Sequence, residues 1–142
     1  MKRMLRLLRD DSAFDLQLVV TDQHVRAQFG HTVDEVRQEF DVAAAVDMEQ
    51  EDDSPEGRAR AVGRCTMRMV DTLRELSPDI CVLYGDRGEV LATATAATLM
   101  GIPIAHLQGG DVSGSLDEQM RHAVTKLAHI HFPSTEESAS RI

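Results

Sequence analysis

The sequence predicts an α/β fold, a Rossmann-like and mostly parallel sheet with helices on its faces in three layers. Three observations carry this prediction. Short apolar runs rich in strand formers alternate with longer segments of helical periodicity. Gly and Pro residues punctuate the boundaries between them. Polar residues follow several of the apolar runs directly, which is typical of the ligand edge of an open α/β sheet.

The elements follow from these runs in chain order. Strands are expected near residues 16–21, 42–46, 80–84, 104–107 and 129–132. Helices are expected over residues 1–9, 33–40 and 90–100, and from Ser115 and Thr135 onward, where capping signatures stand. Residues 47–56 are strongly acidic and are expected to form a solvated loop. A long helix follows this loop, with a buried stripe of Val62, Cys65, Met69, Leu73 and Leu76.

Composition limits the class of partner. The chain has 142 residues, 42% of them hydrophobic and 27% charged, which is ordinary for one globular domain. The net charge of −9 argues against nucleic acid or an anionic membrane as a partner, whereas a phosphorylated ligand remains compatible. No apolar run approaches membrane-spanning length. Cys65 and Cys81 are expected to be buried free thiols, which fits a reducing cytoplasm.

Charged residues stand where the apolar runs end. Asp86 and Arg87 follow the run that ends at Tyr84, so Asp86 is either a general base or a turn residue in a local ion pair with Arg87. Arg87 is suited to hold a phosphate or to orient a carboxylate. Asp117 and Arg121 lie four residues apart on one helix face, where a simple ion pair is the alternative to a functional role.

Histidines form a second group of candidates. His24 and His106 lie at the expected ligand edge. His129 and His131 alternate along one strand and share a face. Such a pair can bind a metal, but no third ligand is evident, so hydrogen-bonded structural histidines are the favoured interpretation and no metal site is predicted.

Several motifs form a combination that is more specific than any one of them. They are Phe29-Gly30-His31-Thr32-Val33-Asp34-Glu35, Val46-Asp47-Met48, Gly85-Asp86-Arg87-Gly88-Glu89, Gly101-Ile102-Pro103-Ile104-Ala105-His106, Gly109-Gly110-Asp111-Val112-Ser113-Gly114-Ser115-Leu116-Asp117 and Arg121-His122-Ala123-Val124-Thr125-Lys126-Leu127-Ala128-His129. This combination closely resembles the hydrolysing UDP-N-acetylglucosamine 2-epimerases, and the resemblance covers nearly the whole chain.

The resemblance implies one half of a glycosyltransferase-B type fold, in which two Rossmann-like domains face each other across a cleft. It implies a reaction that converts UDP-N-acetylglucosamine to N-acetylmannosamine and UDP for sialic-acid-type sugar synthesis, without a metal or other cofactor. In that reaction a base removes the proton from C2 of the sugar while UDP leaves from C1. Water then adds to the glycal intermediate.

The resemblance also assigns roles to residues of this chain. Asp86 and Asp117 match the family's catalytic carboxylates, and Arg121 matches an arginine that contacts phosphate or anchors them. His106 matches the histidine that opens the glycine loop. The expected substrate-binding residues are Arg87, His106, Gln108, Asp111, Arg121 and His24.

One position departs from the family pattern. Gln108 stands where the family commonly has a catalytic glutamate. A glutamine amide neither takes nor gives a proton at neutral pH, so Gln108 can only orient a ligand. Either the acid–base work is distributed over Asp86, Asp117 and Asp111, or the activity is reduced or different.

The family pattern extends beyond both ends of this chain. Residues 1–142 are therefore expected to be a single, incomplete domain, with the family's first strand and its second, nucleotide-binding domain outside it. The missing strand predicts a gap in the sheet between the strands at 16–21 and 80–84. A self-associating chain without epimerase activity of its own is expected. The alternatives are a non-catalytic nucleotide-sugar-binding or interaction module, and an epimerase acting on another nucleotide-activated amino sugar.

Overall fold

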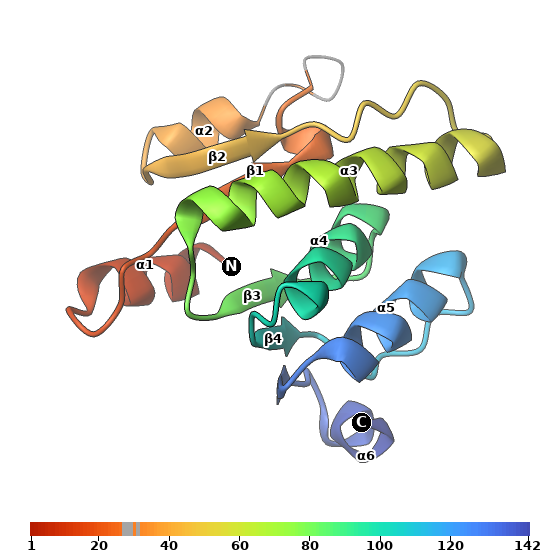
Figure 1. The fold of residues 1–142 in the computed structure, drawn as a ribbon. Helices are drawn as coiled ribbons and strands as arrows, with labels where there is room; N and C mark the ends of the chain where they lie inside the picture. The colour runs from red at the N-terminus through yellow and green to blue at the C-terminus, as the bar shows by residue number, and fades with distance from the viewer. Residues whose placement is uncertain (27–29, 31) are drawn as a thin grey trace.

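A computed structural model describes residues 1–26, 30 and 32–142, and shows strands that alternate with helices (Figure 1). The helices are α1 (Lys2–Asp10), the short 3-10 helix η1 (Asp22–His24), α2 (Val33–Arg37), α3 (Pro55–Leu76), α4 (Gly88–Leu99), α5 (Leu116–Leu127) and α6 (Glu136–Arg141). The strands are β1 (Leu18–Thr21), β2 (Val42–Val46), β3 (Cys81–Tyr84), β4 (Ile104–Leu107) and β5 (Ile130–Phe132). Phe29 and His31 lie outside the described residues. Within the described residues, no helix has both the length and the apolar character of a membrane span.

All the strand pairs are parallel, and the strands form two separate sheets. β1 pairs with β2, and β3, β4 and β5 form the second sheet in that order. No ladder joins β1 to β3 among the described residues, so the predicted gap between these two strands is confirmed. The expected strands were each within two residues of the observed ones, because the apolar runs that predict them are the buried segments themselves.

The core lies between α3, α4 and the sheets. The fully or nearly buried side chains of α3 are Ala61, Cys65, Met69 and Leu73, four residues apart, so they form one face of the helix. The side chains that α4 buries are small, mostly alanine, and this lets α3 approach closely. At Gly88, where α4 begins, an added Cβ would lie 2.9 Å from Val62 Cγ2 of α3. α4 packs against both α3 and α5, which explains why its residues are apolar almost all round.

The two cysteines are free thiols, as predicted. Cys65 lies in the buried stripe of α3, and Cys81 begins β3 and is half-buried. Burial raises the pKa of both thiols to about 11, because an apolar surrounding disfavours the thiolate.

The start of α3 differs from the prediction. The acidic segment expected to be a loop through residue 56 ends earlier, because α3 begins at Pro55. Ser54 caps this helix by accepting a hydrogen bond from the Gly57 N–H at 2.9 Å, and Pro55 occupies the first helical position, where its missing N–H costs nothing. Ser54-Pro55 is therefore a helix-start signal that the acidic surroundings obscured.

One face of the second sheet is apolar and uncovered. Val82 and Ile130 flank Ala105 in one row of the ladder, and Tyr84 and Phe132 flank Leu107 in the next. These four outer side chains are 45–56% exposed, whereas Leu83 and His106 on the opposite face are buried. An apolar face of this kind is typical of a surface that another element or chain covers.

The exposed face predicts self-association of the chain. Replacing Ile130 and Phe132 together by Thr should shift the chain toward monomer, because both changes remove apolar area from the uncovered face while keeping side chains that suit a strand. Sedimentation velocity over a range of concentrations measures this. Leu99→Thr, at an 82% exposed position on α4, is the control and should leave association unchanged. A wild-type chain that stays monomeric at high concentration would contradict the prediction.

Candidate functional site

The site lies where β3 and β4 end, and a buried arginine connects its parts. Arg121, on α5, is 8% exposed. Its Nη2 pairs with Oδ2 of Asp86, in the turn after β3, and its Nη1 donates to the Asp111 carbonyl oxygen at 2.6 Å, in the loop after β4. One guanidinium therefore holds the turn and the loop together. Neither simple alternative for these residues is correct: Asp86 does not pair with Arg87, and Arg121 does not pair with Asp117, in the described residues.

Asp117 stands one helical turn before Arg121 on α5. Its side chain is exposed and makes no hydrogen bond or ion pair within the described part of the chain. The carboxylate lies in the first turn of the helix, where the helix dipole favours negative charge. Asp117 is thus available to a ligand, while Asp86 is already held by protein.

His106 lies beneath the Asp86 turn and is fully buried. Its Nε2 lies 3.0 Å from the Gly85 carbonyl oxygen, and its Nδ1 lies 3.1 Å from Thr125 Oγ1. A carbonyl can only accept, so Nε2 carries the proton and Nδ1 accepts from the Thr125 hydroxyl. Burial lowers the pKa of His106, which keeps the ring neutral. Both ring nitrogens are engaged by protein groups, so His106 fixes the turn that presents Asp86.

The glycine loop between β4 and α5 is held tightly. Gln108 is exposed and has a left-handed φ of 64°, and its N–H donates to the Phe132 carbonyl at 3.0 Å. Gly110 also has a positive φ, and a Cβ there would lie 2.3 Å from the Ser138 carbonyl oxygen on α6. The loop therefore needs glycine at 110 for both conformation and space.

The start of α5 was predicted correctly, but its capping was not. Ser115 occupies the cap position without a side-chain cap bond. The Glu118 carboxylate instead accepts from the N–H groups of Ser113 at 2.6 Å and Gly114 at 2.5 Å. The acidic residue of the apparent capping box thus fastens the glycine loop onto the helix.

A second charged group lies at the ends of β1 and β3. Arg87 Nε is 3.1 Å from Glu89 Oε1, and Nη2 is 4.0 Å from Asp22 Oδ2. Burial raises the pKa of both carboxyl groups. Asp22 is 3% exposed, has a φ of 41°, and its Oδ1 has no hydrogen-bond partner among the described residues. The sequence did not single out Glu89, since an acidic residue in a first helical turn is common for structural reasons alone.

The remaining histidines occupy separate places. His24 is exposed, and its Nδ1 lies 2.7 Å from Thr32 Oγ1. His129 Nδ1 accepts from the Ile104 N–H at 3.2 Å, which supports the structural interpretation. His131 Nδ1 is buried without a hydrogen-bond partner among the described residues.

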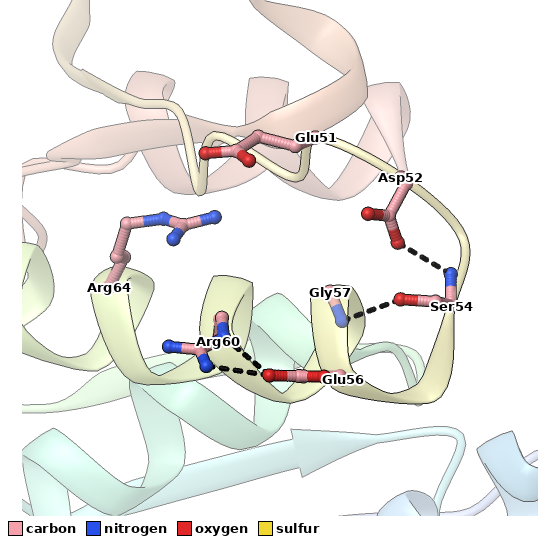
Figure 2. A pocket seen from close by; sticks show the side chains of 7 residues that line it. All are labelled: Glu51, Asp52, Ser54, Glu56, Gly57, Arg60 and Arg64. Atoms are coloured by element: carbon pink, nitrogen blue, oxygen red, sulfur yellow. Dashed lines mark hydrogen bonds and ion pairs between the residues drawn. The ribbon is translucent and has the colours of Figure 1, made fainter.

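A hollow of about 460 Å³ lies elsewhere, at the start of α3 (Figure 2). It is lined by Glu51, Asp52, Ser54, Glu56, Gly57, Arg60 and Arg64. Both of its arginines have partners nearby: Arg60 binds Glu56, and Arg64 donates to the Glu49 carbonyl at 2.6 Å. None of the predicted site residues lines it, so it is separate from the site at the sheet edge.

His106 predicts a pH dependence of stability. The pKa of His106 in the folded state is lowered from 6.5. Its contribution to the free energy of unfolding is therefore fully present above that pH, and it is lost as the pH falls through the lowered folded-state pKa. The free energy of unfolding should fall by at most about 1.4 kcal/mol per pH unit below roughly pH 6.5 from this group. Urea unfolding of wild type and His106→Gln at several pH values measures this, and the variant should lose that part of the dependence. His122→Gln, on the surface, is the control; equal slopes for wild type and His106→Gln would contradict the assignment.

Substitution of two glycines of the loop should lower the free energy of unfolding by different amounts. Gly110 and Gly114 both have positive φ, but only Gly110 has a neighbour where a Cβ would be. Gly114→Ala should cost about 1–2 kcal/mol of unfolding free energy from conformation alone. Gly110→Ala should cost a further 1–3 kcal/mol, approximately, from overpacking against Ser138. Urea unfolding at one pH compares them, and equal losses would show that α6 does not pack on the loop.

Comparison with known proteins places these features in a family. The sequence model described as UDP-N-acetylglucosamine 2-epimerase matches residues 6–142. A UDP-N,N'-diacetylbacillosamine 2-epimerase (hydrolyzing) from Legionella pneumophila is 36% identical over 143 residues, covering 100% of this chain and 38% of the relative. A GDP/UDP-N,N'-diacetylbacillosamine 2-epimerase (hydrolyzing) from Campylobacter jejuni is 30% identical over 137 residues, covering 96% of this chain and 36% of the relative.

A solved structure gives the same result for the fold. The UDP-GlcNAc 2-epimerase from Neisseria meningitidis, crystallised with UDP-GlcNAc, aligns with a TM-score of 0.77 at 22% identity, over 96% of this chain and 37% of that chain. The predicted fold class, one Rossmann-like half of a glycosyltransferase-B type arrangement, is confirmed. The chain spans little more than a third of the proteins that it matches. It belongs to the UDP-N-acetylglucosamine 2-epimerase family.

Proposed function

We propose that this chain supplies catalytic carboxylates of a hydrolysing 2-epimerase that converts UDP-N-acetylglucosamine to N-acetylmannosamine and UDP. The observation that carries the proposal is the buried Arg121, which holds the Asp86 carboxylate and the Asp111 main chain together at the sheet edge. A carboxylate fixed by an arginine is suited to proton transfer in one defined direction. Asp117, exposed on the same helix as Arg121, supplies a second carboxylate.

The proposed chemistry needs two proton transfers at C2 and one from the attacking water. One carboxylate takes the proton from C2, the electrons of that bond form the C1–C2 double bond, and UDP leaves with the electrons of its bond to C1. Water then adds at C1 and loses a proton to a carboxylate, while a carboxylic acid returns a proton to C2 with the opposite configuration. Asp86 and Asp117 are the proposed acid and base, with Asp111 beside them and Gln108 limited to orienting the ligand.

Charge and position support the proposed binding roles. Arg87 keeps N–H groups beyond those that face Glu89 and Asp22, and these can meet a phosphate. His24, exposed where β1 ends, is proposed as a further ligand contact. His106 is proposed to act on the substrate through the position of Asp86, because its ring is fully enclosed.

The proposal includes the domain organisation of the protein and its cellular location. Residues 1–142 form one wall of a cleft, and a second, nucleotide-binding domain is needed to hold UDP and to exclude water. The chain alone is expected to self-associate and to release no UDP. Its two free thiols fit a reducing, cytoplasmic setting.

Two other functions have specific support. The Legionella and Campylobacter relatives are named as diacetylbacillosamine 2-epimerases, which favours a UDP-activated sugar with a second acetamido group as an alternative substrate. Gln108 favours a module that binds a nucleotide sugar without turning it over.

One experiment separates these functions. The protein, expressed with all residues that its gene encodes, is incubated with UDP-N-acetylglucosamine or UDP-N,N'-diacetylbacillosamine in D₂O. Released UDP and deuterium at C2 of the product are measured by NMR. Turnover with inversion at C2 is expected, and Asp86→Asn should lower it by about 10²–10⁴-fold because a proton-transfer group is lost. Asp79→Asn, just before β3, is the control.

The outcomes are distinct. Turnover of only the diacetylated substrate would replace the proposed sugar, and binding without UDP release would support the module. Turnover that survives Asp86→Asn would remove Asp86 from the acid–base role.

A further inference from the structure

A buried hydroxyl on the C-terminal helix holds one oxygen of Asp111. Ser138, on α6, is 2% exposed, and its Oγ donates to Asp111 Oδ1 at 2.5 Å. The two residues are 27 positions apart, so this contact joins α6 to the glycine loop rather than stabilising either one locally. Neither the family motifs nor the spacing of the sequence indicated Ser138.

The direction of this hydrogen bond is fixed by its neighbours. Thr135 Oγ1 accepts from the Ser138 N–H at 3.0 Å as the cap of α6, and it lies 2.9 Å from Ser138 Oγ. An ionised carboxylate can only accept, so the single hydroxyl proton of Ser138 is directed to Asp111. The Ser138 oxygen then accepts from the Thr135 hydroxyl. A chain of hydrogen bonds thus runs from Thr135 through Ser138 to Asp111 with one orientation.

α6 is also held against the loop at the main chain. The Ser138 carbonyl occupies the space that a side chain at Gly110 would need. Arg141 Nη1 donates to the Gly110 carbonyl oxygen at 3.1 Å. These contacts keep the Ser138 hydroxyl in place relative to the loop, so it is not a surface group that meets Asp111 by chance.

Asp111 is therefore held at both its main chain and its side chain. Its carbonyl oxygen accepts from Arg121, which also holds Asp86, and its Oδ1 accepts from Ser138. Its Oδ2 has no hydrogen bond within the described residues, and the side chain is half-buried at the site. With one oxygen fixed, the direction of the other is fixed as well.

We propose that Ser138 is a positioning residue that aims Asp111 Oδ2 at the sugar of the bound nucleotide sugar, where it accepts a hydrogen bond from a hydroxyl or amide N–H. This inference rests on the proposed function, because it assigns Asp111 to the same site. A carboxylate that rotates freely loses its alignment with the reacting sugar, so the effect of losing Ser138 falls on kcat more than on KM.

The test is a double-mutant cycle in the protein expressed with all residues that its gene encodes. Ser138→Ala should lower kcat for UDP release at least tenfold with KM changed less than threefold. In the Asp111→Asn background the same change should have little further effect, because the group that Ser138 orients is gone. Ser140→Ala is the matched control: its hydroxyl donates to the Glu136 carbonyl within α6, and activity should be unchanged.

A second readout does not depend on turnover. Carboxyl ¹³C NMR of the chain at a fixed neutral pH should show a changed Asp111 Cγ shift in Ser138→Ala, with the Gly109 and Gly110 amide signals retained. An unchanged Cγ shift overturns the inference whatever the activity, and so does a Ser138→Ala protein that does not fold, since Ser138 is then structural. An equal fall in kcat in the Asp111→Asn background also overturns it. If the wild type releases no UDP while Ser138→Ala shows the expected Cγ change, the proposed function is overturned. The catalytic consequence of the inference is then overturned with it.

Discussion

The arrangement of the site depends on one buried guanidinium. Arg121 is nearly enclosed, and a charge taken out of water needs partners in good geometry. Its partners come from two different strand ends, the Asp86 carboxylate after β3 and the Asp111 carbonyl after β4. α5 presents Arg121 because Val124, one turn further, is fully buried in the core. Packing of an apolar helix face thus sets the place of the charge that organises the polar edge.

Further hydrogen bonds beneath and beside the Arg121–Asp86 pair hold this edge of the sheet in place. His106 braces the Gly85 turn from the core side, and Glu118 fastens the loop amides to the first turn of α5. The neighbouring Asp22 shows that the edge is not optimised for stability. It combines a left-handed backbone, burial and an oxygen without a hydrogen-bond donor among the described residues. Unfavourable features of this kind gather at functional sites, where other parts of the fold compensate for them.

The fold was predictable where local sequence carries the information. Apolar runs such as Ile104–Leu107 are buried strands, and the run of small residues before Leu99 is a helix between two other helices. The start of α3 was predicted too late in the chain, because the acidic residues around Ser54 are typical of a solvated loop and Ser54 was not interpreted as a helix cap.

The contacts among the candidate site residues could not be predicted from the sequence. Asp86, Asp111 and Arg121 were candidates, and spacing left the short-range pairs Asp86–Arg87 and Asp117–Arg121 open as alternatives. The structure pairs Arg121 with Asp86, 35 residues away, because the βα units bring the ends of neighbouring strands together. Contacts of that range depend on the register of β3 against β4, which no local pattern reveals. The same holds for Glu89 and Ser138, whose roles arise only from what lies next to them in space.

The raised pKa of the two thiols has a practical consequence for labelling chemistry. With pKa values of about 11, Cys65 and Cys81 are almost wholly protonated at neutral pH, and the thiolate is the form that reacts with maleimides and iodoacetamides. The native chain therefore has a low background for such reagents. A single cysteine introduced on an exposed helix position becomes a selective attachment point for a fluorophore or spin label, without prior removal of the natural cysteines from the core.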